Sequence, residues 1–211
     1  GAVLESIVRW VGETQKESEE YSEPGPPIVS PAGTRDPFYY AVTGFTGGSD
    51  HIVFVDGGVR VPAVMFICWP DMWYHTSGDT PDKSDATQLK RVVVIGAAAA
   101  AFLANAGPAE TPRILAETSG RGLARLGLEK LRAETLLTEA DDQGLGEARR
   151  EALNIIDQAF SREKEAVLTC RFFAGGDPAV EGLIKSRAAA LDPVRAAMSR
   201  EVEDLHLLRC R

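Results

Sequence analysis

The feature that most constrains the fold is a change of pattern at Asn105-Ala106-Gly107-Pro108. Before this break, helical stripes alternate with apolar, β-prone segments. After it, almost every signal is helical. A chain of 211 residues is long enough for one or two domains. We therefore predict an α/β unit with few strands over residues 1–107, followed by a mainly α-helical region over residues 108–211.

Two amphipathic helices are predicted in the first unit. An apolar stripe predicts a helix over residues 2–20, and the Pro- and Gly-rich segment 22–27 predicts a loop after it. Asp85 with Gln88 three residues later has the pattern of a capping box that opens a helix ending near Asn105. We expect the larger apolar side chains of this second helix, Leu89, Val92, Val93 and Phe102, to face the core. The small residues 97–101 are suited to close packing on a sheet.

Two strands and one short helix are predicted between them. Residues 38–42 are aromatic and β-branched, which is typical of a strand. Residues 61–69 form a continuous apolar run with a proline near its start, as expected for a strand buried on both faces. Cys68 should then be a buried, inert thiol. Residues 50–55 follow two glycines and predict one or two helical turns.

The second region reads as a small helical bundle. Three capping residues stand before a proline, at Thr111, Asp177 and Asp192, and this pattern marks helix starts. Glycines at positions 120, 122 and 127 are expected to interrupt the first helix. The predicted helices cover residues 111–139, 146–170, 178–191 and 193–208.

Charge and composition exclude some partners. The net charge of −8 argues against a nucleic acid or an anionic membrane surface, because both attract basic patches. The longest apolar run, residues 92–104, is shorter than the roughly 20 residues of a membrane-spanning helix, so a soluble protein is expected. The sequence shows no signal peptide, and the compartment stays open. Cys170 and Cys210 are interpreted as free thiols rather than as a disulfide pair.

Two segments carry candidate site residues. Residues 69–82 follow the apolar run directly and contain Tyr74 and His75. A histidine at the exit of a buried strand has a fixed approach and suits a metal ion, since zinc binds neutral imidazole. The second segment, residues 47–54, contains Ser49-Asp50-His51.

Together these segments resemble the C-terminal part of the M28 family of zinc aminopeptidases. The resemblance rests on the S-D-H-x-x-F pattern at residues 49–54 and the Y-H-T-x-x-D-T pattern at residues 74–80, and it covers about residues 1–107. It implies part of an α/β/α sandwich with His75 as a zinc ligand. It also implies Tyr74 as the donor that stabilises the oxyanion during peptide hydrolysis by a metal-activated water.

Simpler roles stay open for each of these residues. His75 can be a packed, hydrogen-bonded histidine, and Tyr74 a half-buried aromatic bonded to backbone. The resemblance places Ser49, Asp50 and His51 at the rim or in the outer shell of the metal pocket, where Asp50 could orient His75. Equally, Ser49 or Asp50 can cap a short helix. Asp79 is expected to fix the loop after His75.

The rest of the family's metal site is missing from the sequence. The pair Glu19-Glu20 sits at a helix end with no His-x-Asp before it, so we reject it as the catalytic pair. His206 lies in the last helix and is interpreted as structural or exposed. One imidazole cannot hold a catalytic zinc, which takes at least three protein ligands. We therefore expect the C-terminal portion of a longer zinc-dependent aminopeptidase plus a helical extension, inactive by itself.

Two alternative functions remain open. The first is a non-catalytic, peptidase-like module that binds a partner or forms a homodimer through the helical region or an exposed sheet surface. The second is a zinc acyltransferase that resembles the glutaminyl cyclases. A peptide would be the substrate of the complete peptidase.

Overall fold

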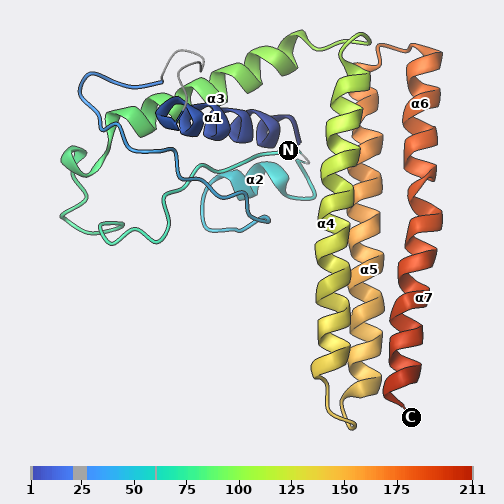
Figure 1. The fold of residues 1–211 in the computed structure, drawn as a ribbon. Helices are drawn as coiled ribbons and strands as arrows, with labels where there is room; N and C mark the ends of the chain where they lie inside the picture. Colours follow the sequence, from blue (N-terminus) through green and yellow to red (C-terminus); the bar gives the residue numbers. More distant parts are fainter. Residues whose placement is uncertain (1, 21–27, 60, 211) are drawn as a thin grey trace. The chain divides into compact units, whose positions relative to one another are not determined.

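The computed structural model describes residues 2–20, 28–59 and 61–210 of the chain, and the predicted loop at residues 22–27 lies outside them. The chain divides into two units, residues 1–105 and residues 106–211. Figure 1 shows an irregular first unit with few helices and a second unit of long, packed helices.

The described residues contain helices and irregular segments but no β-strand, so the predicted α/β sandwich is wrong. Residues 38–42 and 61–69 lack regular secondary structure, although their composition is β-prone. A strand is held by hydrogen bonds to a neighbouring strand, and β-propensity alone does not supply that partner. At the start of the second segment, the backbone N–H of Val61 instead donates to the carbonyl oxygen of Phe54 (2.7 Å).

The first unit is built on two helices, α1 (Ala2–Glu20) and α3 (Ala86–Asn105), which pack against each other. Between them lie the short helix α2 (His51–Val55) and the 3-10 turn η1 (Pro81–Lys83). The α1 helix buries Val11, and at Gly12 the ring of Tyr40 lies where a β-carbon would stand. The absent side chain of Gly12 thus lets the segment after α1 pack onto the helix.

Helix α3 is confirmed, but it turns an unexpected face to the core. Asp85 caps it, accepting a hydrogen bond from the Gln88 N–H (2.9 Å). Leu89 and Val93, which we expected inside, are exposed. The buried face instead carries four other side chains, Thr87, Arg91, Ile95 and Ala99.

The polar members of that face are bonded to the backbone of the segment before it. Thr87 accepts a hydrogen bond from the Ser30 N–H (3.0 Å), and the Arg91 guanidinium donates to the Asp36 carbonyl (2.7 Å). Helix α3 therefore packs on α1 and on this irregular segment, whose backbone groups bond to Thr87 and Arg91. The small-residue surface expected to lie on a sheet is largely exposed at positions 97, 98, 100 and 101.

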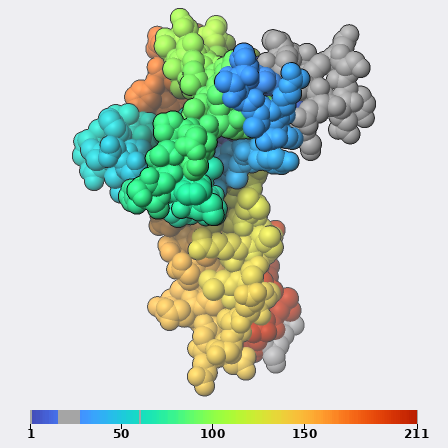
Figure 2. All heavy atoms as spheres, turned by 90° about the vertical axis from the view of Figure 1, so that its left-hand side faces the viewer, coloured from blue at the N-terminus to red at the C-terminus, as the bar shows by residue number. Residues whose placement is uncertain are grey.

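Much of the apolar content of the first unit lies at the surface. Figure 2 shows the segment between α2 and α3 lying uncovered on the outside of this unit. Met72 and Tyr39 are 80% and 85% exposed, and Phe45, Ile67 and Trp69 are exposed too. Cys68 is also exposed, so the prediction of a buried thiol is wrong. Extensive exposed apolar surface of this kind is typical of an interaction surface.

Four helices and one 3-10 turn form the second unit (Figure 1). Helix α4 runs through 29 residues without interruption, so the expected break at its three glycines does not occur. The remaining helices lie within a few residues of their predicted bounds. In order, the elements are α4 (Thr111–Glu139), α5 (Leu145–Leu168), η2 (Thr169–Phe173), α6 (Pro178–Ala189) and α7 (Leu191–Arg209).

The three predicted caps have different outcomes. Asp177 caps α6 as predicted, accepting hydrogen bonds from the backbone N–H groups of Ala179 (2.8 Å) and Val180 (3.2 Å). Thr111 is already helical and donates its hydroxyl proton to the Gly107 carbonyl (2.8 Å). Asp192 lies inside the first turn of α7 and pairs with Lys164 (2.7 Å). Proline is tolerated in the first turn of a helix, so α7 can start at Leu191, before Pro193.

The core of the second unit is a continuous apolar seam between α4, α5 and α7. Leu126 and Leu137 of α4 meet Ile156 and Phe160 of α5, and α7 adds Val202. Positions 156 and 160 therefore lie on the buried face of α5. Alanines of α5 at positions 148, 152 and 159 are also buried and allow the helices to approach closely.

Among the described residues, α3 has the length and the apolar composition that a membrane crossing requires, because the helix extends beyond the apolar run at residues 92–104. One such helix is weak evidence, because the core helix of a soluble protein meets the same criteria. The buried Arg91 contact with Asp36 shows that α3 has polar partners within its own unit.

Candidate functional site

The segment with the candidate residues is folded by its own polar groups. The Asp71 carboxylate accepts a hydrogen bond from the Trp73 N–H (2.8 Å), and the Trp73 carbonyl accepts from both the N–H (3.0 Å) and the hydroxyl (2.7 Å) of Thr76. The Asp79 N–H then donates to the Thr76 carbonyl (3.2 Å). This series of short-range bonds forms a compact turn with His75 near its middle.

His75 is exposed and has a left-handed backbone conformation, with φ of 58°. This region is uncommon for residues other than glycine, although histidine is among those enriched there. Its ring stacks on the Tyr74 ring, with centroids 3.9 Å apart and planes 18° apart. The turn thus presents the imidazole and the phenol side by side.

Tyr74 is held on its other side by Trp69. The two rings meet edge to face, with centroids 5.7 Å apart. Such contacts contribute about 0.5–1.5 kcal/mol beyond the burial of area. Since Tyr74 is 47% exposed, the structure does not bury it in a core.

Asp79 and its neighbours stabilise the end of the turn. Asp79 does so through its backbone, and its side chain is exposed. The Thr80 hydroxyl donates to the Gly78 carbonyl (3.3 Å) and to the Asp82 carboxylate. Hydrogen bonds from Lys83 and Thr80 hold the pKa of Asp82 below its usual range. The hydrogen bonds in this part of the segment therefore stabilise the turn.

The Ser49-Asp50-His51 segment begins α2. The carbonyl oxygens of Ser49 and Asp50 accept hydrogen bonds from the N–H groups of Ile52 and Val53 (both 3.1 Å), while the Asp50 side chain makes no capping hydrogen bond. The His51 Nε2 contacts the Thr46 carbonyl oxygen (2.7 Å). His51 also packs against Phe45, with ring centroids 5.4 Å apart. The contacts of His51 are thus with its own loop, and the orienting role predicted for Asp50 stays a prediction.

The described residues do not fit a zinc ion without further ligands. Among the residues whose side chains the structure describes (2–15, 28–59 and 61–210), no three His, Cys, Asp or Glu side chains lie close enough together to hold a metal ion. A zinc ion needs at least three protein ligands. His75 can therefore be one ligand of a site, but the described part of the chain cannot supply the others.

A charged site that we did not predict lies in the second unit. Glu163 is only 2% exposed, and its carboxylate accepts two hydrogen bonds from the Arg125 guanidinium (2.9 and 2.7 Å). Arg162 adds a third (3.1 Å). Burial opposes ionisation, but these bonds and charges outweigh it and hold the pKa of Glu163 below its ordinary value.

One signal in the sequence points to this carboxylate. In α5, Ile156, Phe160 and Val167 form a buried stripe with helical spacing, and position 163 falls on the same stripe. An acidic residue at a core position needs a cation nearby, because unpaired buried charges are rarely tolerated. Identifying Arg125 as the partner requires the packing of α4 on α5.

Comparisons with known proteins give one match. Residues 5–100 match the model of Peptidase family M28, a range that contains both candidate segments. No curated protein and no solved structure matches the chain. The match agrees with the two patterns at residues 49–54 and 74–80, and it points to a peptidase-related function. Residues 5–100 are therefore similar to peptidase family M28, and this match supports membership of that family.

Proposed function

We propose that residues 5–100 are the C-terminal part of the catalytic domain of a zinc aminopeptidase, and that the described chain alone is inactive. In the complete domain, His75 is one metal ligand and Tyr74 binds the reacting carbonyl oxygen. One observation carries the proposal: the family match spans the exposed turn in which the Tyr74 and His75 rings stack.

The geometry of the turn suits these two roles. Tyr74 has a ring fixed between His75 and Trp69 and remains half exposed, so its hydroxyl can donate to a substrate oxygen that becomes negative. His75 belongs to the same turn and is held by the local hydrogen bonds around it. Preorganised donors of this kind stabilise charge without rearranging during the reaction.

The uncovered apolar surface of the first unit also supports an incomplete domain. The β-prone segments 38–42 and 61–69 have no strand beside them in the described part of the chain. Helix α3 also exposes Leu89 and Val93. Further residues of the peptidase domain would cover this apolar surface and that helix face.

The helical alternative has less support. A binding or dimerisation module built on residues 146–208 needs an exposed apolar stripe. The main stripe, formed by Ile156, Phe160 and Val167, is buried, and the exposed residues Phe172, Leu207 and Leu208 lie near the ends of their helices. The glutaminyl-cyclase alternative uses the same two segments. The product distinguishes it from the aminopeptidase, because cyclisation of an N-terminal glutamine releases ammonia, whereas peptide hydrolysis releases an amino acid.

The first experiment measures zinc per chain after equilibration with zinc and exhaustive dialysis. It compares the wild type with His75→Ala and Cys210→Ser. The second variant is needed because the Cys210 Sγ and His206 Nε2 atoms lie 3.6 Å apart. Two ligands of one tetrahedral zinc ion are separated by about the same distance, roughly 3.5 Å, so this pair can retain zinc unrelated to peptidase chemistry.

We expect little zinc in the wild type and no aminopeptidase turnover. Zinc that disappears only in Cys210→Ser belongs to the helical region and leaves the proposal intact. Stoichiometric zinc that disappears in His75→Ala, or turnover that this variant abolishes, would contradict the claim that the chain alone is inactive.

A chimera tests the proposed roles directly. Residues 5–100 replace the matching segment of an active M28 aminopeptidase, and Tyr74→Phe, His75→Ala and Cys68→Ser are compared in that background. We expect activity that His75→Ala removes together with one zinc, and that Tyr74→Phe lowers in kcat by about 10²-fold or more, as for the loss of one oxyanion donor. Cys68→Ser is the matched exposed control. A folded chimera that keeps its activity without His75 would refute the assignment.

A further inference from the structure

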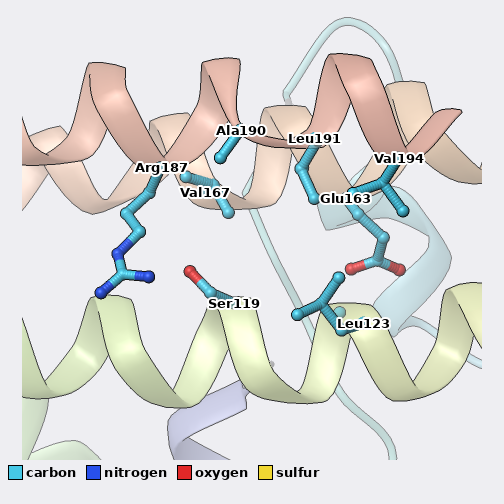
Figure 3. A pocket seen from close by; sticks show the side chains of 9 residues that line it. Ser119, Leu123, Glu163, Val167, Arg187, Ala190, Leu191 and Val194 are labelled. Carbon is cyan, nitrogen blue, oxygen red and sulfur yellow. The ribbon is translucent and has the colours of Figure 1, made fainter. Parts of the chain in front are cut away.

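The second unit contains a cavity that the proposed peptidase function does not use. Its volume is about 120 Å³, and it lies between α4, α5 and the junction of α6 with α7 (Figure 3). Most of its lining is apolar, including Leu123, Val167, Leu191 and Val194. An engineered apolar cavity of about 150 Å³ binds benzene, so this volume suits a ligand of about six non-hydrogen atoms.

One polar atom beside the cavity lacks a hydrogen-bond partner. The Ser119 Oγ is shielded from solvent and has no hydrogen-bond partner among the described residues. Figure 3 shows the hydroxyl pointing from α4 into the space between the helices. A buried hydroxyl without a hydrogen bond is unfavourable, so this position is suited to a polar atom of a ligand.

A cation lies on the same side of the cavity. Arg187 extends from α6 toward α4 on the side of Ser119, whereas Glu163 lies at the other side (Figure 3). Arg187 is exposed, and no ion pair or hydrogen bond of its side chain is found in the described part of the chain. An arginine fork with free N–H donors matches a carboxylate.

Glu163 does not compete for that end of the cavity. Its two oxygens already accept hydrogen bonds from Arg125 and Arg162, which also compensate its charge. A ligand with an ammonium group would find the Glu163 carboxylate already paired at one end of the cavity. At the other end it would be repelled by the Arg187 cation. The chemistry of the cavity therefore favours an anion at the Arg187 end and hydrocarbon in the middle.

We propose that this cavity binds a small aliphatic carboxylate. The carboxylate group pairs with Arg187 and accepts a hydrogen bond from the Ser119 hydroxyl. The alkyl chain lies between Leu123, Val167 and Leu191. For a ligand this small, a dissociation constant on the order of 1 mM is expected.

The test is a titration of the full chain with butyrate, followed by NMR shifts of backbone amides and arginine side-chain N–H groups. Butyramide is the matched uncharged ligand. Arg187→Gln removes the cation, and Arg195→Gln is the matched control because Arg195 is exposed on α7 and pairs with Asp157 (2.8 Å). Ala190→Leu adds a side chain at a position that lines the cavity.

We expect saturable shifts near Ser119 and Arg187 with butyrate, and at least tenfold weaker binding of butyramide. Arg187→Gln should weaken butyrate binding by about tenfold or more, whereas Arg195→Gln should not. Ala190→Leu should abolish butyrate binding if this variant folds. If it does not fold, the butyrate affinity of Arg187→Gln tests the proposal instead. Absence of saturable wild-type binding, equal affinity for butyramide, or unchanged affinity in Arg187→Gln would each overturn the proposal.

Discussion

The buried carboxylate of Glu163 makes the second unit dependent on Arg125. We predict that Arg125→Met lowers the free energy of unfolding by removing two of the hydrogen bonds to that carboxylate. Methionine keeps much of the aliphatic length of arginine, so the change removes charge and hydrogen bonds more than packing. Arg132→Met is the matched control, since Arg132 is exposed and its oxygen partner on Glu129 is 3.7 Å away.

The magnitude follows from the geometry. Removing one partner of a buried ion pair costs about 3–5 kcal/mol, because the remaining charge is left without compensation. Two facts reduce that figure here: Arg125 itself is 38% exposed, and Arg162 continues to donate to Glu163. We therefore expect a loss of about 2 kcal/mol for Arg125→Met, and at most about 0.5 kcal/mol for the exposed control.

The assay is urea unfolding of the full chain followed by helical circular dichroism, at pH 7 and at pH 3. The pKa of Glu163 is lowered in the folded state, so its contribution is present above its ordinary value of 4.5 and is lost as the pH falls further. The difference between wild type and Arg125→Met should therefore shrink at pH 3. A loss below 0.5 kcal/mol at pH 7, or an equal loss in Arg132→Met, would refute this account.

Two further predictions concern the architecture of the second unit. Asp177→Ala removes the cap of α6, and we expect a loss of about 1 kcal/mol in a thermal or urea titration; no measurable loss would mean that the capping bonds contribute nothing. Ile156→Ala truncates a side chain that is 1% exposed, and a loss of about 3–4 kcal/mol is expected, against less than about 0.5 kcal/mol for Leu128→Ala at an exposed position. Similar losses for these two variants would contradict the assignment of the core.

Helices were easier to predict than the packing of the first unit. Helix periodicity and caps are local, and the cap residues Asp85 and Asp177 mark helix starts that the structure confirms. Strands depend on partners elsewhere in the chain, so the β-prone residues 38–42 and 61–69 did not specify a sheet by themselves. The error at Cys68 follows from the same cause, because its burial was inferred from the missing sheet.

The candidate site, too, was only partly predictable from the sequence. The motif around Tyr74 and His75 was visible in the sequence, and the structure places the two rings side by side. The orienting role of Asp50 toward His75 stays a prediction. The Arg125–Glu163 pair was missed because it joins positions 38 residues apart on two helices. Only the packing of those helices shows that they meet.

The packing of Gly122 against Glu163 restricts how these two positions can change during evolution. A β-carbon at this position would lie 3.0 Å from a Glu163 carboxylate oxygen, whereas one at Gly120 or Gly127 would meet nothing within 4 Å. A larger residue at position 122 would force that carboxylate to shift against its hydrogen bonds from Arg125 and Arg162, unless Glu163 had first been replaced by a smaller side chain. The order of the two substitutions matters, and lineages that retain the buried carboxylate should also retain the glycine.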